Sequence, residues 1–284
     1  MEATPTRIVV ISDLHCGCQM GLCPPGGAKL DEGGHYNPNK IQRAMWVWWR
    51  EFWDKFVPEV TRKQPHDILL NGDGIDNEHH GVKTLISNNI EVQRRLLCEV
   101  LGPEVKRAQK HGGRFYVVRG TEAHDGGSGQ DVEAVARELG AVPDDCGRFS
   151  RWDLRKRIAG PNKHCVLHAM HHIGGTGGSH YDSSAPKREL IEEFIEAARA
   201  ADYPPTFVVR SHRHRYCPVE EMTDWGRARC IVTPGWQAKT GFSHKIAGAR
   251  VSPPQFGGIV CINGEEETYH RVYWKRLQGS RIEE

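Results

Sequence analysis

Residues Arg7-Ile-Val-Val-Ile-Ser-Asp-Leu-His15 form an apolar run that ends at two side chains able to bind a metal ion. Four consecutive β-branched residues predict a central strand that is covered on both faces. Side chains two positions apart on a strand point to the same face, so Asp13 and His15 are expected to lie together just past its carboxyl end. A polar turn after a strand would give the same short pattern, so support must come from elsewhere in the chain.

The composition fits a globular metal-binding protein. The 284 residues are enough for a large buried core, and no linker separates the carboxy-terminal part, so we expect a single domain over residues 1–284. The formal net charge is only +2, which gives no sign of a strong basic field for nucleic acid. The chain has sixteen histidines, many of them near Asp, Glu or Gly at the ends of apolar runs. A metal site would explain this composition.

The start of the chain shows neither a signal peptide nor a membrane segment. Residues 1–6 are short and polar, and the apolar run that follows is far below the roughly 20 residues that span a bilayer. Nine scattered cysteines, an odd number, favour a reducing compartment over a disulfide framework. We therefore expect a cytoplasmic protein without a membrane partner, and the sequence leaves its oligomeric state open.

A long loop and a tryptophan-rich helix are expected after the first strand. Residues 17–39 are rich in Gly and Pro, which predicts a long surface loop next to the site. Residues 41–63 have the pattern of a helix. One stripe of this helix would pack on a sheet, and its members are Met45, Trp49, Phe52, Trp53 and Phe56. Trp46 and Trp48 lie off that stripe and remain candidate substrate contacts.

The same order of strand, glycine and ligand types recurs twice. Ile68 to Leu70 is expected to be a short buried strand, and Gly72-Asp73 turns its end. The carboxylate of Asp73 could bridge two cations, and Asp76 could orient a ligand or cap the following turn. The next copy has a strand at 115–118 and a turn at Gly120, followed by its chemically active residues, Glu122, His124 and Asp125.

Two further copies are built from histidine. A strand that begins near His164 ends at His171, or at His168 in a shorter interpretation, and should pair with residues 152–158. After a helix at 188–199, the next strand leads to His212 and His214, which share a face. A single histidine at a strand end is more often structural than a ligand. Five strand ends in one chain, each closing on Asp, Glu or His, are hard to produce by chance.

The order of these motifs along the chain resembles that of the calcineurin-like metallophosphoesterase superfamily. The motifs are D-x-H, G-D-x-x-D, a Gly-to-His-Asp turn, a strand-end His and H-x-H. The resemblance covers Arg7 to about Cys261. It implies an α/β fold, a four-layer αββα sandwich of two mixed β-sheets flanked by helices, with two divalent cations at the strand ends. It assigns Asp13, His15 and His214 to the first metal, Asp73 to the bridge and His212 to the second metal. We expect His171 as the fourth-motif ligand, with His168 as the alternative.

The third motif departs from the family pattern. The family usually has Gly-Asn-His-Asp or Gly-Asn-His-Glu, in which Asn is a metal ligand and His a catalytic acid. Here the turn is Gly120-Thr-Glu-Ala-His-Asp125, two residues longer and without Asn. We assign the role of the missing Asn to Glu122, with Thr121 as a weaker alternative, and the substrate-facing role to His124. Ser211 stands where glycine usually precedes the H-x-H pair, a change expected to matter little.

Such a site would hydrolyse phosphate esters. Two cations roughly 3.5 to 4 Å apart can polarise phosphorus and hold a bridging hydroxide for in-line attack. His124 and Asp73 are the expected catalytic residues. Mixed Asp, His and Glu ligands suit Mn²⁺, Fe or Zn²⁺ better than Ca²⁺, and the sequence does not choose among the three. We therefore expect a dinuclear metal-dependent phosphoesterase, with phosphodiesters as the favoured substrate class.

Two alternatives stay open. The superfamily includes DNA-repair exonucleases, and Arg213 and Arg215 are interleaved with the ligand histidines, with Lys239 and Lys245 further along the chain. A DNA exonuclease or endonuclease is therefore the alternative enzyme, and nucleic acid its partner. A metal-binding scaffold without catalysis is the alternative of another class, which the presence of His124 disfavours. The segments 231–241 and 255–262 are expected to be outer strands of the second sheet, with a loop over the site.

Overall fold

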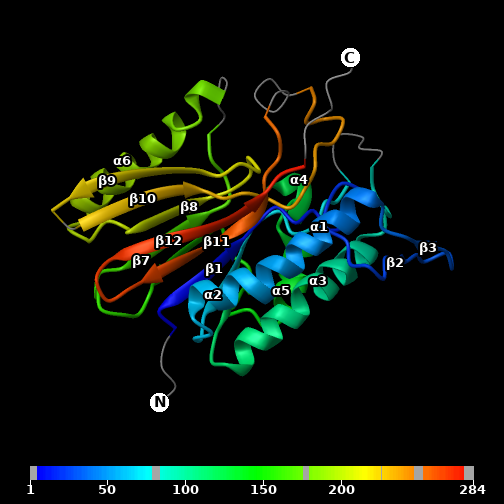
Figure 1. Ribbon diagram of the computed structural model, residues 1–284, viewed down its shortest axis with the longest axis horizontal. Helices are drawn as coiled ribbons and strands as arrows, with labels where there is room; N and C mark the ends of the chain where they lie inside the picture. The colour runs from blue at the N-terminus through cyan, green and yellow to red at the C-terminus, as the bar shows by residue number, and fades with distance from the viewer. Residues whose placement is uncertain (1–4, 79–83, 175–178, 225, 246–251, 278–284) are drawn as a thin grey trace.

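The protein is a sandwich of two five-stranded β-sheets with helices on both outer faces (Figure 1). The computed structural model describes residues 5–78, 84–174, 179–224, 226–245 and 252–277. One apolar cluster lies between the two sheets, a second between the first sheet and its helices, and a third beneath the helix on the second sheet. The four-layer α/β sandwich predicted from the motifs is confirmed.

The first sheet is built around the strand that opens the chain. In spatial order its strands are β12 (Thr268–Lys275), β11 (Phe256–Asn263), β1 (Arg7–Ile11), β4 (Asp67–Asn71) and β5 (Phe115–Val118). Val9 lies opposite Ile68 of the parallel strand β4 and opposite Val260 of the antiparallel strand β11. Burial of β1 and β4 is nearly continuous, as predicted for strands covered on both faces.

The second sheet carries the two histidine motifs. Its strands, in spatial order, are β6 (Asp153–Arg157), β7 (Val166–Met170), β8 (Phe207–Arg210), β10 (Gly226–Val232) and β9 (Cys217–Thr223). Val209 lies opposite Ala169 of β7 and Ile231 of β10, both in parallel pairs. The expectation that residues 231–241 and 255–262 supply outer strands of this sheet is wrong. β10 is internal, and β11 is buried along its whole length because it pairs with β1 in the other sheet.

The helices cover opposite outer faces of the sandwich (Figure 1). Those on the first sheet are α1 (Lys40–Glu51), the π-helical segment η1 (Phe52–Phe56), α2 (Val57–Thr61), α3 (Ile90–Lys110) and α5 (Gln130–Glu138). The second sheet is covered by α6 (Ser184–Arg199). Short elements are β2 (Ala28–Lys29), β3 (His35–Tyr36), α4 (Glu122–Asp125) and η2 (Ser179–Tyr181).

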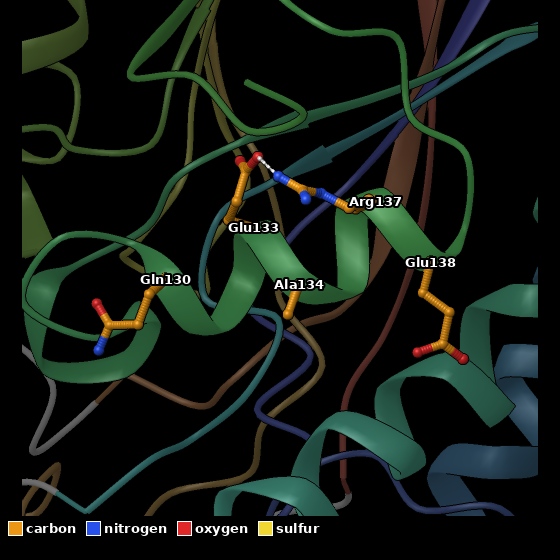
Figure 2. A pocket seen from close by; sticks show the side chains of 5 residues that line it. All are labelled: Gln130, Glu133, Ala134, Arg137 and Glu138. Carbon is orange, nitrogen blue, oxygen red and sulfur yellow. Dashed lines mark ion pairs between the residues drawn. The ribbon is translucent and has the colours of Figure 1, made fainter. Parts of the chain in front are cut away.

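On α5, Glu133 and Arg137 form an ion pair (Figure 2). Among the described residues, no helix is long and apolar enough to cross a bilayer.

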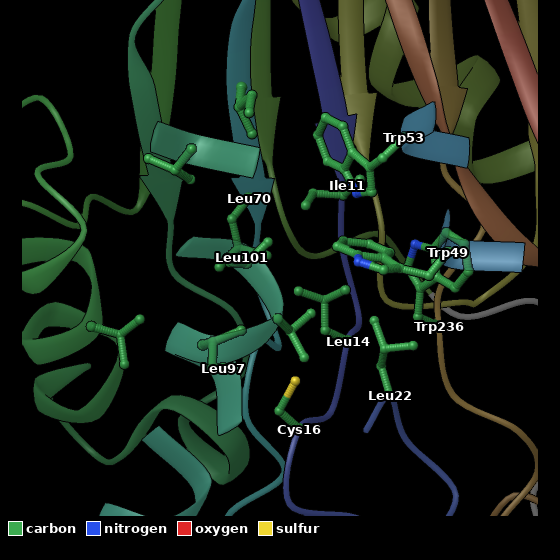
Figure 3. Close-up of a cluster of buried hydrophobic side chains, with 14 of the residues drawn as sticks. Ile11, Leu14, Cys16, Leu22, Trp49, Trp53, Leu70, Leu97, Leu101 and Trp236 are labelled. Atoms are coloured by element: carbon green, nitrogen blue, oxygen red, sulfur yellow. The ribbon is translucent and has the colours of Figure 1, made fainter. Parts of the chain in front are cut away.

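The tryptophan-rich helix packs through the stripe predicted from its spacing (Figure 3). Trp49 is fully buried, and its ring lies 5.0 Å from that of Trp236, nearly at right angles. Phe56, on the same stripe, is only partly buried. Trp46 and Trp48 also pack against this cluster as partly buried residues. We therefore account for them as packing residues rather than substrate contacts.

The segment after β1 is not the surface loop expected from its Gly and Pro content. Leu22 and Cys23 are fully buried, and only the second half forms an exposed excursion around β2 and β3. The buried side chain of Gln42 donates hydrogen bonds to the carbonyl oxygens of Cys18 and Gly21 at 3.1 and 3.2 Å. Helix α1 therefore holds the chain immediately after the first pair of candidate metal ligands.

Candidate metal centre

Side chains from all five motifs meet where the strands of both sheets end. Among the described residues, three groups of side chains have possible ligand atoms within 4.8 Å of one another. They are Asp13, His15 and His214; Asp73, His171 and His212; and His15, Asp76 and His124. The first two groups contain six of the seven predicted metal ligands, and the third contains the predicted catalytic histidine.

In the first group two imidazoles and a carboxylate converge. His214 Nε2 lies 3.2 Å from Asp13 Oδ1 and 3.2 Å from His15 Nε2. Asp13 and His15 are buried, so water does not compete freely for these atoms. Nitrogen and oxygen donors directed at one point suit a transition-metal ion.

The second group adjoins the first. His171 Nε2 lies 3.0 Å from Asp73 Oδ2 and 3.9 Å from Asp13 Oδ1, and His212 Nδ1 lies 3.8 Å from Asp73 Oδ2. Asp13 Oδ1 and His171 Nε2 are both buried, and neither makes a hydrogen bond within the described part of the chain. Buried polar atoms are normally satisfied, so these two are where cations would be expected to bind. The residues present therefore fit the binding of divalent metal ions.

Five of the six candidate ligands in the first two groups share an unusual backbone conformation. Those with left-handed φ are Asp13 at 54°, His15 at 44°, Asp73 at 50°, His212 at 71° and His214 at 50°. Side-chain-bearing residues seldom adopt this conformation, which costs on the order of 1 kcal/mol or more and persists only where neighbours enforce it. The shared direction of Asp13 and His15 therefore comes from a tight turn and not from the alternation of an extended strand.

A buried carboxylate orients His15. Asp76 Oδ1 lies 2.9 Å from His15 Nδ1 and also accepts a hydrogen bond from Gln237 Nε2 at 3.0 Å. The contact favours a proton on Nδ1 and leaves the lone pair of Nε2 for a metal ion. This is the supporting role predicted for Asp76. Gln237 was not predicted, because nothing in the local sequence marks a Gln in a connection between strands as part of the site.

His124 lies beside the two groups with one nitrogen held by the main chain. Its Nδ1 donates to the carbonyl oxygen of Asp76 at 2.6 Å, which directs Nε2 to 3.9 Å from Asp73 Oδ2. Its ring stands nearly at right angles to that of His15, with centroids 4.5 Å apart. His124 is thus close enough to reach a molecule bound at the cluster.

The structure does not bring Glu122 to the cluster. Glu122 is exposed and belongs to none of the three groups. Thr121, the weaker alternative, donates through its N–H and its hydroxyl to Asp73 Oδ1 at 2.7 and 3.2 Å. Helical geometry explains the difference, because in the single turn α4 residue 122 is rotated by about 100° from residue 121 while residues 124 and 125 return toward it. The sequence identified Glu122 as the stronger oxygen ligand but did not show in which direction its side chain points.

Of the two candidate histidines in and after β7, His171 lies at the cluster and His168 does not. His171 is buried, and its Nδ1 donates to the carbonyl oxygen of Asn71 at 2.7 Å, so Nε2 faces the cluster. His168 instead hydrogen-bonds Glu193 of α6. Strand alternation places residue 168 on the outer face of the second sheet, whereas His171 follows the end of the strand.

Mutual electrostatics set the charges of the cluster. Burial opposes ionisation of Asp13, but His214 and His171 outweigh it and lower the pKa of the carboxyl to about 2. Burial likewise opposes protonation of His171, but Asp73 and Asp13 raise its pKa to about 10. In the metal-free protein, a proton on His171 therefore balances carboxylate charge. Burial and the neighbouring His15 lower the pKa of His124 to about 4, so this imidazole is neutral near pH 7.

The arginines interleaved with the ligand histidines point away from the cluster. Arg213 donates to the carbonyl oxygens of Asp182, at 3.0 Å, and Gly174. Arg215 pairs with Asp182 Oδ2 at 2.9 Å and donates to Ser252 Oγ at 2.5 Å. Both side chains thus hold the connections that follow β7 and β10. They are engaged within the protein, which removes much of the support for a nuclease.

A surface depression on α5 is separate from the cluster (Figure 2). It is lined by Gln130, Glu133, Ala134, Arg137 and Glu138, none of which belongs to a ligand group. Glu133 accepts hydrogen bonds there from the main-chain N–H groups of Phe149 and Ser150. This carboxylate therefore has a structural role in fixing the chain before β6.

The sandwich and the strand-end cluster agree with the calcineurin-like metallophosphoesterase fold that the motifs predict. No protein-family model and no curated protein matches the chain. Solved structures do match it, among them Vacuolar Protein Sorting 29 from Cryptosporidium parvum, with 12% identity, a TM-score of 0.37, and coverage of 97% of this chain and 100% of that one.

Two further solved structures also match the chain. A sulfate thiohydrolase SoxB from Thermus thermophilus has 10% identity and a TM-score of 0.38, covering 98% of this chain and 57% of that one. A metallophosphoesterase from Sphaerobacter thermophilus has 10% identity and a TM-score of 0.37, covering 96% and 88%. The sheets and side chains described above, rather than these distant likenesses, carry the assignment of the fold.

Close packing at Gly120 gives a test of the cluster. A Cβ atom there would lie 2.1 Å from Asp73 Oδ1 and 2.3 Å from Asp73 N, so Gly120→Ala must displace the end of β4. Because such displacement moves a candidate ligand, we expect the affinity for Mn²⁺ to fall about 10- to 100-fold, as for changes beside other metal ligands. Titration calorimetry on folded protein measures this.

Gly127→Ala is the matched control, since a Cβ atom there meets nothing within 4 Å. This variant should bind Mn²⁺ as the wild type does. If both variants retain wild-type affinity, Asp73 is not a ligand.

Proposed function

We propose that the protein is a metal-dependent hydrolase of phosphate esters, and of phosphodiesters in particular. The observation that carries this proposal is the pair of adjoining Asp and His groups with His124 beside them. When bound, two divalent cations would polarise the phosphoryl group of the substrate and activate a water molecule. Because the metal-activated water is the attacking group, the chemistry needs no nucleophile from the protein.

The protein's own part is to hold the ligands in place. His171 Nε2 lies within 4 Å of both Asp73 and Asp13, so the two subsites share a boundary at which Asp73 can serve as the bridge. Asp76 holds His15, and the carbonyl oxygen of Asn71 holds His171. Prior fixing of ligand directions lowers the reorganisation that binding and turnover require.

His124 is the residue that we assign to proton transfer. Its Nδ1 is fixed by the Asp76 carbonyl oxygen, so Nε2 is the atom available to a leaving oxygen. A bound phosphate anion favours the protonated imidazole, because an opposite charge nearby stabilises the charged form. General acid catalysis of this kind contributes about 10² to 10⁴ in rate.

Asp73→Asn is expected to remove most of the activity while leaving the fold intact. The amide has the shape of the carboxylate but lacks the charge that would hold two cations. The measurement is hydrolysis of an aryl phosphodiester with Mn²⁺, before and after treatment with a chelator. Full activity in the chelator, or in the variant, would contradict the proposal. Stoichiometric metal binding by the wild type without any turnover would favour the scaffold alternative.

His124→Ala should reduce turnover and leave the metal content near that of the wild type. Its Nδ1 is held by the Asp76 carbonyl oxygen, so Nε2, 3.9 Å from Asp73 Oδ2, is the atom that we assign to proton transfer rather than to metal binding. The loss should shrink for substrates with a good leaving group, which need little protonation. Paired assays with nitrophenyl and alkyl diesters measure it. Loss of metal from this variant would show that His124 is a ligand.

Phosphodiesters of small or medium size are expected to be cleaved faster than duplex DNA. The chain has a net charge of only +2, and Arg213 and Arg215 are committed to other residues. A side-by-side panel with Mn²⁺ would compare an aryl monoester, an aryl diester, a cyclic nucleotide, and single- and double-stranded DNA at two salt concentrations. Dominant cleavage of DNA with a steep salt dependence would favour the alternative that the protein is a nuclease.

A further inference from the structure

His172 is an exposed imidazole between two buried neighbours. It directly follows His171 of the second group, which is 1% exposed. On its other side Ile173 is 6% exposed and packs with Ala185 and Val232. The main chain is therefore anchored before and after His172, which fixes the point on the surface from which its side chain extends.

That place is the edge of the second ligand group. The ring centroid of His172 lies 5.3 Å from that of His212, with 31° between the planes. It lies 5.5 Å from the centroid of His171, with the two rings nearly perpendicular. Within the described residues, no hydrogen bond engages the ring nitrogens of His172. An imidazole that is anchored at a cluster and yet unused by the protein is suited to a bound molecule.

We infer that His172 is a second substrate-facing residue, which binds the phosphoryl oxygens from the side of Asp73, His171 and His212. This inference rests on the proposed function. His124 lies against His15 of the first group and His172 against His212 of the second, so one imidazole flanks each subsite. The oxygens of a tetrahedral phosphate ester point in different directions. The leaving oxygen would face His124, and the non-leaving oxygens would face His172.

The two histidines should therefore have different kinetic roles. A hydrogen bond from His172 to a non-leaving oxygen exists both in the bound substrate and in the transition state. Such uniform binding affects KM more than kcat, whereas proton transfer by His124 affects kcat. A hydrogen bond to a charged phosphoryl oxygen also contributes to binding of free inorganic phosphate. Phosphate binding is thus a readout that does not depend on turnover.

The experiment compares wild-type protein with His172→Ala, each loaded with Mn²⁺. We expect the variant to keep the wild-type metal content and to bind inorganic phosphate about tenfold more weakly by calorimetry, which is about 1.4 kcal/mol. The KM for an aryl phosphodiester should rise by a similar factor, with kcat changed much less. His172→Gln, which retains an N–H donor near the same reach, should restore part of the affinity.

His111→Ala is the matched control, because His111 is also exposed but lies at the far end of α3, before β5. It should behave as the wild type in both assays. Unchanged phosphate affinity in His172→Ala, loss of metal from it, or failure of the loaded wild type to bind phosphate would each overturn the inference. Weakened phosphate binding in the variant, with no turnover by the wild type, would count against the proposed function alone.

Discussion

The cluster depends on main-chain pairing that continues after strands β1 and β4 have ended. The N–H of Asp13 donates to the carbonyl oxygen of Gly72 at 3.0 Å, and the N–H of His15 donates to that of Asp73 at 3.1 Å. These bonds join residues whose left-handed conformation is unfavourable by itself. Each turn thus supports the other, which places candidate ligands of different motifs against one another.

A chain of short polar side chains joins the two sheets beneath this cluster. Thr233 Oγ1 lies 2.8 Å from the hydroxyl of Ser12 and 2.8 Å from that of Ser211, to which Asn71 Nδ2 donates at 2.7 Å. All four residues are fully buried. Ser211 occupies the place where glycine is usual in the resembled family, and its hydroxyl is used in this network. We expected this departure to matter little, but the hydroxyl links the turn after β8 to the first sheet.

The sequence was most informative where one short segment determined the outcome. The strand at Ile8–Ile11 and the stripe around Trp49 follow from local periodicity, and both were predicted. The directions of side chains within turns were not predicted. Glu122 and Thr121 are neighbours in the sequence, and their different rotation around α4 decides which of them contacts Asp73. Gln237 and the partner of β11 depend on contacts between distant parts of the chain, which no local pattern records. Long-range pairing and turn geometry therefore account for the errors.

The alternation of His and Arg in residues 212–215 joins the ligand loop to the rim of the site. The two histidines belong to the candidate ligand groups, while Arg213 and Arg215 fasten the connections that contain Asp182 and Ser252. Under the proposed function, substitutions in those connections would alter both the surface that a substrate meets and the support of two candidate ligands. Substrate range and metal affinity would then be linked during evolution, and a lineage that reshapes the rim would have to preserve these anchors or replace them.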